Sequence, residues 1–234
     1  MKSAKQKTLH EIGGRPLIGH ALHAAAGLNP KHLVAVVGHQ RDQVSPAVEA
    51  IAAELGRGVA QAVQEEQNGT GHAVQCGLAP LPDFTGTVIV TNGDVPLLRP
   101  ETIRGLYDAH VAAGNAVTVL SMQLDDPTGY GRIVRDTDGS VKAIVEQKDA
   151  SPEQLSIDEV NSGVFAFDGA ILRDALTKLD SNNAQGELYI TDVLEIARTA
   201  GHNVGAHIAA DAGELAGVND RVQLAAAGRE LNRR

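Results

Sequence analysis

The amino-acid sequence predicts an α/β fold with a doubly wound, mostly parallel sheet and a small antiparallel lobe. Short runs rich in Val and Ile alternate with longer helical patterns through the first half of the chain, which is the rhythm of βαβ units. After Asp125 the strand-like runs follow one another without a helix between them, as in antiparallel hairpins. With 43% hydrophobic side chains in 234 residues, the chain can bury one sizeable core, and we expect a single domain over residues 1–234.

Each element is expected from its pattern and its flanking residues. Pro100 at a first helical turn and Gly114-Asn115 as a left-handed stop bound a helix over residues 101–113. Residues 136–139, Asp-Thr-Asp-Gly, are typical of the turn of a hairpin between strands 130–134 and 141–145. The remaining strands are expected at residues 33–37, 59–63, 87–90, 116–124, 160–167 and 203–208, and the remaining helices at 16–26, 42–55, 73–78, 170–179, 190–199 and 221–231.

Composition and charge argue against several classes of partner. A formal net charge of −9 and a pI near 5.4 repel polyanions, so we expect no nucleic acid and no membrane surface as a main partner. No apolar run is long enough to span a bilayer or to follow the N-terminal lysines as a signal segment. The single cysteine, Cys76, lies in a helical pattern and is expected to be a buried small hydrophobe in a reducing compartment. These observations predict a cytoplasmic protein.

Asp94 is the first candidate functional residue. The strand at residues 87–90 runs into Thr91-Asn92-Gly93-Asp94, which places a carboxylate beyond the carboxyl end of an expected parallel strand, where open α/β sheets bind ligands. A turn or helix-capping aspartate is the alternative. Metal binding here would need more oxygen ligands, since Mg²⁺ requires an octahedral shell and usually takes only one or two ligands from protein, with phosphates and water completing the shell. No paired histidine spacing and no legible Ser, Cys or His nucleophile accompany it, which argues against covalent catalysis.

Other polar positions are open to two interpretations. The turn at residues 68–72, Asn-Gly-Thr-Gly-His, opens a helical pattern and can present backbone N–H groups to a ligand, or it is a tight connection with no ligand. The lysines Lys2, Lys5 and Lys7 suit phosphate contact or form a solvated terminus. Glu146 and Asn161 stand at strand ends, where they point at a polar ligand such as a sugar or are satisfied locally.

These positions belong to an ordered series of motifs that spans nearly the whole chain. With them the chain resembles the uridyltransferase domain of the bacterial bifunctional N-acetylglucosamine-1-phosphate uridyltransferase/glucosamine-1-phosphate acetyltransferase family. The resemblance implies a Rossmann-like fold of the nucleotide-diphospho-sugar transferase type, whose antiparallel lobe binds the sugar. The motifs are KTLH at 7–10, NGTGHA at 68–73, NGDVPLL at 92–98, DDPTGYGRI at 125–133, IVEQKDA at 144–150, EVNSG at 159–163, NNAQGELY at 182–189 and GVNDR at 217–221.

The resemblance implies a reaction and a role for each matched residue. The reaction is Mg²⁺-dependent transfer of UMP from UTP to N-acetylglucosamine 1-phosphate, which gives UDP-N-acetylglucosamine and pyrophosphate, an early step towards peptidoglycan. Asp94 and Asn219 match the Mg²⁺ ligands, and Lys7 matches the lysine that contacts phosphate. The uridine-binding positions are Gln64, Gly69 and Thr70, with Asn92 and Gly93 lining the nucleotide. The sugar-binding positions are Gly131, Glu146 and Asn161, with Tyr130, Tyr189 and Thr191 as neighbours.

The chain departs from the family's pattern in three places. The family opens with a strand and a Leu-Ala-Ala-Gly-x-Gly-Thr-Arg-Met loop that cradles the triphosphate, and Met1 aligns with the last residue of that loop. Gln6 stands where the family has proline, and no hexapeptide repeat of the acetyltransferase domain follows Arg234. We therefore expect the sequence to begin inside a longer protein, which in this family is commonly a trimer. A catalytically dead remnant that binds UDP-sugars, or another sugar-1-phosphate nucleotidyltransferase, is the alternative.

Overall fold

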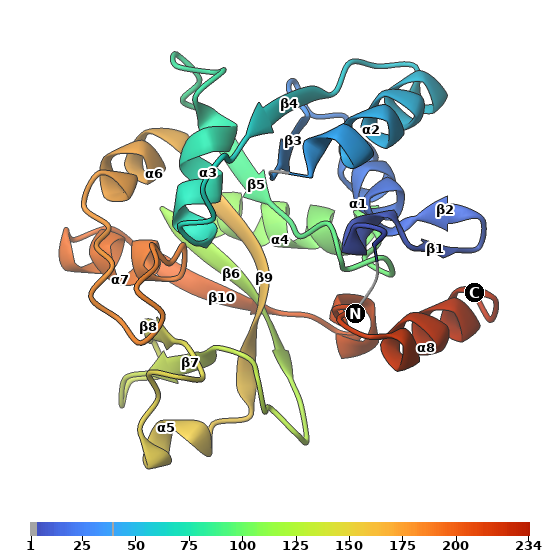
Figure 1. The fold of residues 1–234 in the computed structure, drawn as a ribbon. Coiled ribbons are helices and arrows are strands. Elements are labelled where there is room, and N and C mark those ends of the chain that lie inside the picture. The colour runs from blue at the N-terminus through green and yellow to red at the C-terminus, as the bar shows by residue number, and fades with distance from the viewer. Residues whose placement is uncertain (1–3, 39) are drawn as a thin grey trace. The chain divides into compact units, whose positions relative to one another are not determined.

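The computed structural model describes residues 4–38 and 40–234, so Lys2 of the expected lysine cluster lies outside the described residues. The chain divides into two compact units (Figure 1). Unit 1 comprises Met1–Glu66, Thr91–Arg104 and Gly213–Arg234, and unit 2 comprises Gln67–Val90 and Gly105–Ala212. Each unit is therefore assembled from segments that are distant in sequence. In the described part of the chain, no helix is long and apolar enough to cross a membrane.

Unit 1 is built around a parallel pair of strands packed by two helices. Strands β3 (Val34–Val37) and β4 (Ala60–Val63) are paired in parallel. Helices α1 (Leu17–Ala26) and α2 (Arg41–Leu55) contribute Ile18, Leu22, Val44, Val48 and Ile51 to the core beside β3. The 3-10 helix η1 (Lys7–Leu9) and the short antiparallel strands β1 (Glu11–Ile12) and β2 (Arg15–Pro16) precede α1. Helix α8 (Arg221–Leu231) adds Ala227 to a second small core with Ile12, Leu17, Leu97 and Val218.

Unit 2 is a six-stranded sheet with helices on it. Its strands are β5 (Thr87–Val90), β6 (Val117–Gln123), β7 (Arg132–Arg135), β8 (Val141–Val145), β9 (Glu159–Asp168) and β10 (Val204–Ile208). The order is β10-β6-β9-β7-β8, and β5 also pairs with β9. The helices are α3 (Thr70–Leu78), α5 (Pro152–Leu155), α6 (Gly169–Leu176) and α7 (Asp192–Thr199), while α4 (Pro100–Ala113) begins in unit 1 and continues into unit 2.

The α/β class is confirmed, and the sheet of unit 2 is mixed. Only β10 and β6 are parallel among the pairs described in this sheet, because the ten-residue strand β9 runs antiparallel to β5, β6 and β7. The expected parallel neighbour of β5 is therefore not the pairing observed: β5 lies antiparallel to β9. The expected hairpin is confirmed, since β7 pairs antiparallel with β8. Figure 1 shows this hairpin and α5 gathered at one end of β6 and β9.

Candidate functional site

The two predicted metal ligands face one cation in unit 1, the ammonium group of Lys7. Lys7 Nζ lies 2.6 Å from Asp94 Oδ2 and 3.1 Å from Asn219 Oδ1. The side chains of Lys7 and Asp94 are 36% and 25% exposed, and Asn219 is exposed, so a ligand can reach all three from solvent. The three residues that were expected at the phosphates and the metal therefore converge on one position, although they come from distant parts of the sequence.

Contacts within and between the segments that carry Lys7, Asp94 and Asn219 hold this arrangement together. Gln6 caps η1, since its side-chain oxygen accepts hydrogen bonds from Thr8 N at 2.8 Å and from Thr8 Oγ1 at 2.7 Å. Thr8 packs against Gly93, where a Cβ atom would meet Thr8 Cγ2 at 3.4 Å. Val218 N donates to Asp94 O at 2.9 Å, which ties the loop before α8 to the loop that carries Asp94.

The donor set fits a small divalent cation. Asp94 offers a carboxylate and Asn219 an amide oxygen, and oxygen ligands of this kind suit Mg²⁺, which usually keeps several water and phosphate ligands. No group of three or more His, Cys, Asp or Glu side chains placed to hold a metal is found among residues 4–38 and 40–234. The Lys7 ammonium lies against both of these oxygens.

The other predicted nucleotide positions of unit 1 lie at strand and loop ends. Gln64 follows β4 directly, and its backbone N–H donates to Val37 O at 2.8 Å, which continues the β3–β4 pairing. Asn92 and Gly93 precede Asp94 and are half-buried. Chain continuity brings Asn92 and Gly93 to the Lys7 site, whereas Gln64 belongs to the carboxyl end of the parallel strand pair.

The predicted uridine positions of unit 2 form a tight turn. Gly69 has φ +100°, and a Cβ atom there would lie 2.5 Å from Leu188 O, so only glycine fits. The hydroxyl of Thr70 accepts a hydrogen bond from Ile190 N at 2.9 Å, and Gly71 N donates to Leu188 O at 2.7 Å. The turn is therefore anchored to the loop at residues 188–190, and the assignment to uridine binding stays a prediction.

The predicted sugar positions are brought together in unit 2. A Cβ atom on Gly131 would lie 3.3 Å from Glu146 Oε1, so the glycine leaves room for that carboxylate. Asn161 N donates to Gly131 O at 2.8 Å, and Asn161 Oδ1 accepts from Gly163 N at 2.8 Å. Burial raises the pKa of Glu146, the nearby Thr191 hydroxyl lowers it, and the charge of Asp149 raises it further. This corner of the sheet thus holds a carboxylate that is costly to ionise.

A second carboxylate whose pKa is raised is affected by the charge of Glu146. Burial, together with the charges of Glu195, Asp180, Glu146 and Asp149, raises the pKa of Asp192 to about 6.

Hydroxyl groups accompany these acids. The Tyr189 hydroxyl donates to Asp149 Oδ2 at 3.1 Å and accepts from Gln185 Nε2 at 3.0 Å. Thr191 is 2% exposed, and its Oγ1 has no hydrogen-bond partner of ordinary geometry. Tyr130 is half-buried, and its carbonyl accepts from Arg132. The predicted neighbours Tyr189 and Thr191 therefore lie close to the acidic group, and their contact with a sugar stays a prediction.

Two other expected positions have local partners. Lys5 Nζ lies 3.8 Å from Glu11 Oε1, so this lysine has an acidic partner on the surface. Cys76 is half-buried on α3, and its Sγ lies 3.6 Å from Nε2 of His72. The expected fully buried cysteine is therefore partly accessible.

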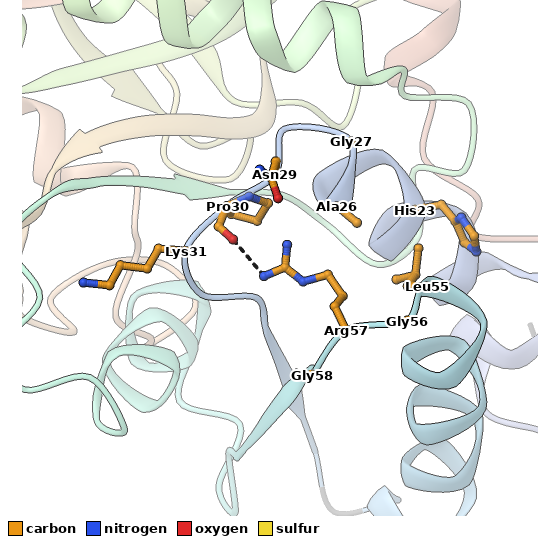
Figure 2. A pocket seen from close by; sticks show the side chains of 10 residues that line it. All are labelled: His23, Ala26, Gly27, Asn29, Pro30, Lys31, Leu55, Gly56, Arg57 and Gly58. Atoms are coloured by element: carbon orange, nitrogen blue, oxygen red, sulfur yellow. Dashed lines mark hydrogen bonds between the residues drawn. The ribbon is translucent and has the colours of Figure 1, made fainter.

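A separate cavity of about 740 Å³ lies in unit 1 (Figure 2). It is formed at the C-terminal ends of α1 and α2, and the Arg57 guanidinium crosses it to donate from Nη2 to Pro30 O at 2.8 Å. None of the predicted site residues lines it; the lining residues are His23, Ala26, Gly27, Asn29, Pro30, Lys31, Leu55, Gly56, Arg57 and Gly58.

Sequence patterns did not reveal the buried carboxylate of Glu214, which pairs with the exposed side chain of Arg99. Glu214, 2% exposed, accepts hydrogen bonds from Arg99 and Thr102. The partners are separated by more than 100 residues, and both ends lie outside regular strands, so no local periodicity marks them.

Several curated bacterial proteins are similar to the chain in sequence. The chain is 80% identical over 234 residues to the bifunctional protein GlmU of Corynebacterium aurimucosum and 72% identical to that of Corynebacterium efficiens. It is 57% identical over 235 aligned positions to that of Mycobacterium sp. strain KMS. All of the chain is covered in each case, and it spans about half the length of these relatives, 48%, 48% and 47%.

Solved structures share the fold at low sequence identity. A UDP-glucose pyrophosphorylase complexed with UDP-glucose superposes with a TM-score of 0.75 at 16% identity, covering 97% of this chain and 90% of that one. A putative glucose-1-phosphate thymidylyltransferase from Bacillus anthracis gives 0.73 at 19% identity, covering 98% and 87%. The family model described as nucleotidyl transferase matches residues 2–215. The chain therefore belongs to the nucleotidyl transferase family.

Proposed function

We propose that the protein transfers UMP from UTP to N-acetylglucosamine 1-phosphate, giving UDP-N-acetylglucosamine and pyrophosphate. Membership of the nucleotidyl transferase family supports the reaction type. The similarity to GlmU proteins at up to 80% identity over the whole chain supports the choice of substrates. Both proposed substrates are small phosphorylated molecules. The net charge of −9 disfavours nucleic acid and anionic membranes as partners, and we propose a cytoplasmic location.

The observation that carries the proposal is the position of Lys7 between Asp94 and Asn219. An ammonium group 2.6 Å from a carboxylate and 3.1 Å from an amide oxygen shows that these two oxygens favour positive charge between them. Mg²⁺ bound there would neutralise negative charge on the triphosphate. Because the lysine side chain is flexible, the ammonium group of Lys7 would then turn to a phosphate oxygen. There it would neutralise part of the charge that moves onto the leaving pyrophosphate.

The chemistry requires no nucleophilic side chain. A phosphate oxygen of the sugar phosphate attacks the α-phosphorus of UTP in line, and the bond from that phosphorus to the oxygen bridging it to the β-phosphate breaks as pyrophosphate leaves. Asp94, Asn219 and Lys7 supply charge and orientation. Positioning and electrostatics therefore carry the rate.

The remaining predicted residues divide between the two substrates. Gln64, Gly69, Thr70, Asn92 and Gly93 are proposed to bind the nucleotide. Gly131, Glu146 and Asn161 are proposed to bind the N-acetylglucosamine moiety, because the glycine exposes the Glu146 carboxylate and carboxylates accept hydrogen bonds from sugar hydroxyls.

The test measures pyrophosphate release and nucleotide-sugar formation from UTP with Mg²⁺, using N-acetylglucosamine 1-phosphate or glucose 1-phosphate as acceptor. We expect a kcat/KM for N-acetylglucosamine 1-phosphate at least about tenfold higher, because a site built to hydrogen-bond a substrate group rejects an analogue that lacks it. Preference for glucose 1-phosphate would assign another sugar-1-phosphate nucleotidyltransferase activity. Tight binding of the UDP-sugar without turnover would show the binding-remnant alternative to be right.

A further inference from the structure

Glu214 is a buried carboxylate outside the set of predicted site residues. Its side chain is 3% exposed, and both oxygens have partners. Arg99 donates to Oε1 from Nε at 2.7 Å and also from Nη2, while the backbone N of Arg99 donates to Oε2 at 3.3 Å and the Thr102 hydroxyl donates to the same oxygen. Burial alone raises the pKa of Glu214, but the hydrogen bonds from Arg99 and Thr102 outweigh it, so the pKa lies below its ordinary value. The carboxylate is therefore ionised at neutral pH.

The pair of Arg99 and Glu214 joins the chain segment that carries Asp94 to the segment that carries Asn219. Arg99 follows Asp94 along one segment, and Glu214 precedes Asn219 by the same number of residues along the other. At the opposite end, Val218 N donates to Asp94 O at 2.9 Å. The two segments thus run antiparallel and are bonded at both ends. The apolar side chains between the ends are buried, namely Val95, Leu97, Leu98, Leu215 and Val218.

We propose that Glu214, through Arg99 and Thr102, is a positioning residue that fixes Asp94 relative to Asn219 and so sets the cation site in advance. The identity of the cation as Mg²⁺ rests on the proposed function. Residues 91–98 and 216–219 lie outside helices and strands, so they lack a regular ladder of hydrogen bonds that would fix their spacing. Groups behind the ligands of a metal commonly set ligand geometry in this way.

The charged pair suits positioning better than an apolar contact would. The Arg99 side chain is 54% exposed, and an ion pair with a solvent-exposed partner contributes little net stability. The planar Arg99 fork and the two oxygens of Glu214 impose direction, because the Nε and Nη2 donors and the Thr102 hydroxyl all have to meet one carboxylate. The two segments can therefore pair in only one register, and this register sets the distance between Asp94 and Asn219.

The test variant is Glu214→Gln in the whole protein, which keeps the side-chain shape and removes the charge. The first measurement is amide hydrogen exchange without added metal under native conditions. We expect exchange in both segments, 92–98 and 215–219, to accelerate about tenfold or more, while α1 and α2 stay at wild-type rates. The second measurement is the Mg²⁺ concentration that gives half-maximal uridylyl transfer, which we expect to rise about tenfold, with the KM for N-acetylglucosamine 1-phosphate unchanged.

Glu159→Gln is the matched control. Glu159 is also a buried carboxylate held by an arginine and a hydroxyl, with Arg135 Nε and Nη2 at 2.8 Å and Ser121 Oγ at 2.8 Å, but it lies in unit 2. We expect this variant to lower the thermal midpoint and to leave both the exchange of residues 92–98 and the Mg²⁺ requirement at wild-type values.

Several outcomes would overturn the positioning role. These are wild-type exchange in either segment of Glu214→Gln, acceleration spread evenly over α1 and α2, or an unchanged Mg²⁺ requirement in an active enzyme. A wild-type protein without uridylyl transfer would refute the proposed function instead, and hydrogen exchange would then decide the role of Glu214 alone.

Discussion

The acidic residues at the two candidate sites have opposite surroundings. In unit 1, Asp94 faces the Lys7 ammonium and Glu214 faces the Arg99 guanidinium. At the predicted sugar positions in unit 2, burial and the charges of nearby acids, Asp149 among them, raise the pKa of Glu146 and of Asp192. The difference indicates two kinds of ligand. Paired opposite charges suit the proposed cation and phosphates, whereas crowded carboxylates suit a ligand that contributes hydroxyl groups and little charge near them.

The largest expected effect comes from the cation site. Asp94→Asn keeps the shape of the side chain but removes its charge, so both Mg²⁺ and Lys7 lose their anionic partner. We expect kcat to fall about a thousandfold, since loss of one charge-stabilising group commonly costs this much. Steady-state pyrophosphate release measures it. Asp174→Asn, which removes an exposed acid paired with Lys178, is the control and is expected to retain activity. Near-normal Mg²⁺-dependent turnover by Asp94→Asn would remove the metal assignment.

A smaller and more selective effect is expected in unit 2. Glu146→Gln retains the shape of the carboxylate beside Gly131 but loses part of its acceptor strength. We expect the KM for N-acetylglucosamine 1-phosphate to rise about ten- to thirtyfold, corresponding to about 1.5–2 kcal/mol for a hydrogen bond to a charged group. The KM for UTP should not change. Initial-rate measurements with each substrate varied in turn separate the two, and an equal rise in both constants would contradict the division between substrates.

The smallest expected effect is on the free energy of unfolding, and it tests whether the crowded carboxylates around Asp192 destabilise the native state. Because the pKa of Asp192 is raised to about 6, the native state binds more protons than the unfolded chain between about pH 4 and pH 6. The free energy of unfolding therefore falls as the pH rises through this interval. Asp192→Asn removes this cost and is expected to stabilise the protein by about 1–2 kcal/mol at neutral pH, less a few tenths for a lost acid at a helix N-terminus.

Urea unfolding at about pH 7.5 and about pH 4 measures the stability difference between Asp192→Asn and the wild type. The gain should disappear at the lower pH, where Asp192 is protonated in the native state. A variant less stable than the wild type at neutral pH would show that Asp192 has a stabilising partner.

Local signals predicted most elements and few of their pairings. Helix α8 was expected at residues 221–231 and is found there, because Asp220 caps it by accepting from Gln223 N at 2.7 Å. The hairpin of β7 and β8 followed from its Asp-Gly turn. The antiparallel pairing of β5 with β9 was not predicted, since a short apolar run has the same pattern in either direction. The strands β1 and β2 are too short, at two residues each, to show a period.

In the candidate site, too, single residues could be recognised in the sequence, whereas the contacts between them could not. Asp94 was visible as a carboxylate in a turn after a strand, and its link to Lys7 and Asn219 came only from resemblance. The contact between these residues depends on how distant segments fold together, and so does the pair of Arg99 and Glu214. Interactions across such sequence distances leave no periodic trace in a single sequence.

A crystal structure of the protein with Mn²⁺ and UTP, without the sugar phosphate, would show through the anomalous signal of manganese whether Asp94 and Asn219 bind the cation. We expect one manganese bonded to the carboxylate of Asp94 and the amide oxygen of Asn219, with Lys7 Nζ moved from between them to a phosphate oxygen. Manganese bound to UTP away from Asp94, with Lys7 still held between Asp94 and Asn219, would contradict this expectation.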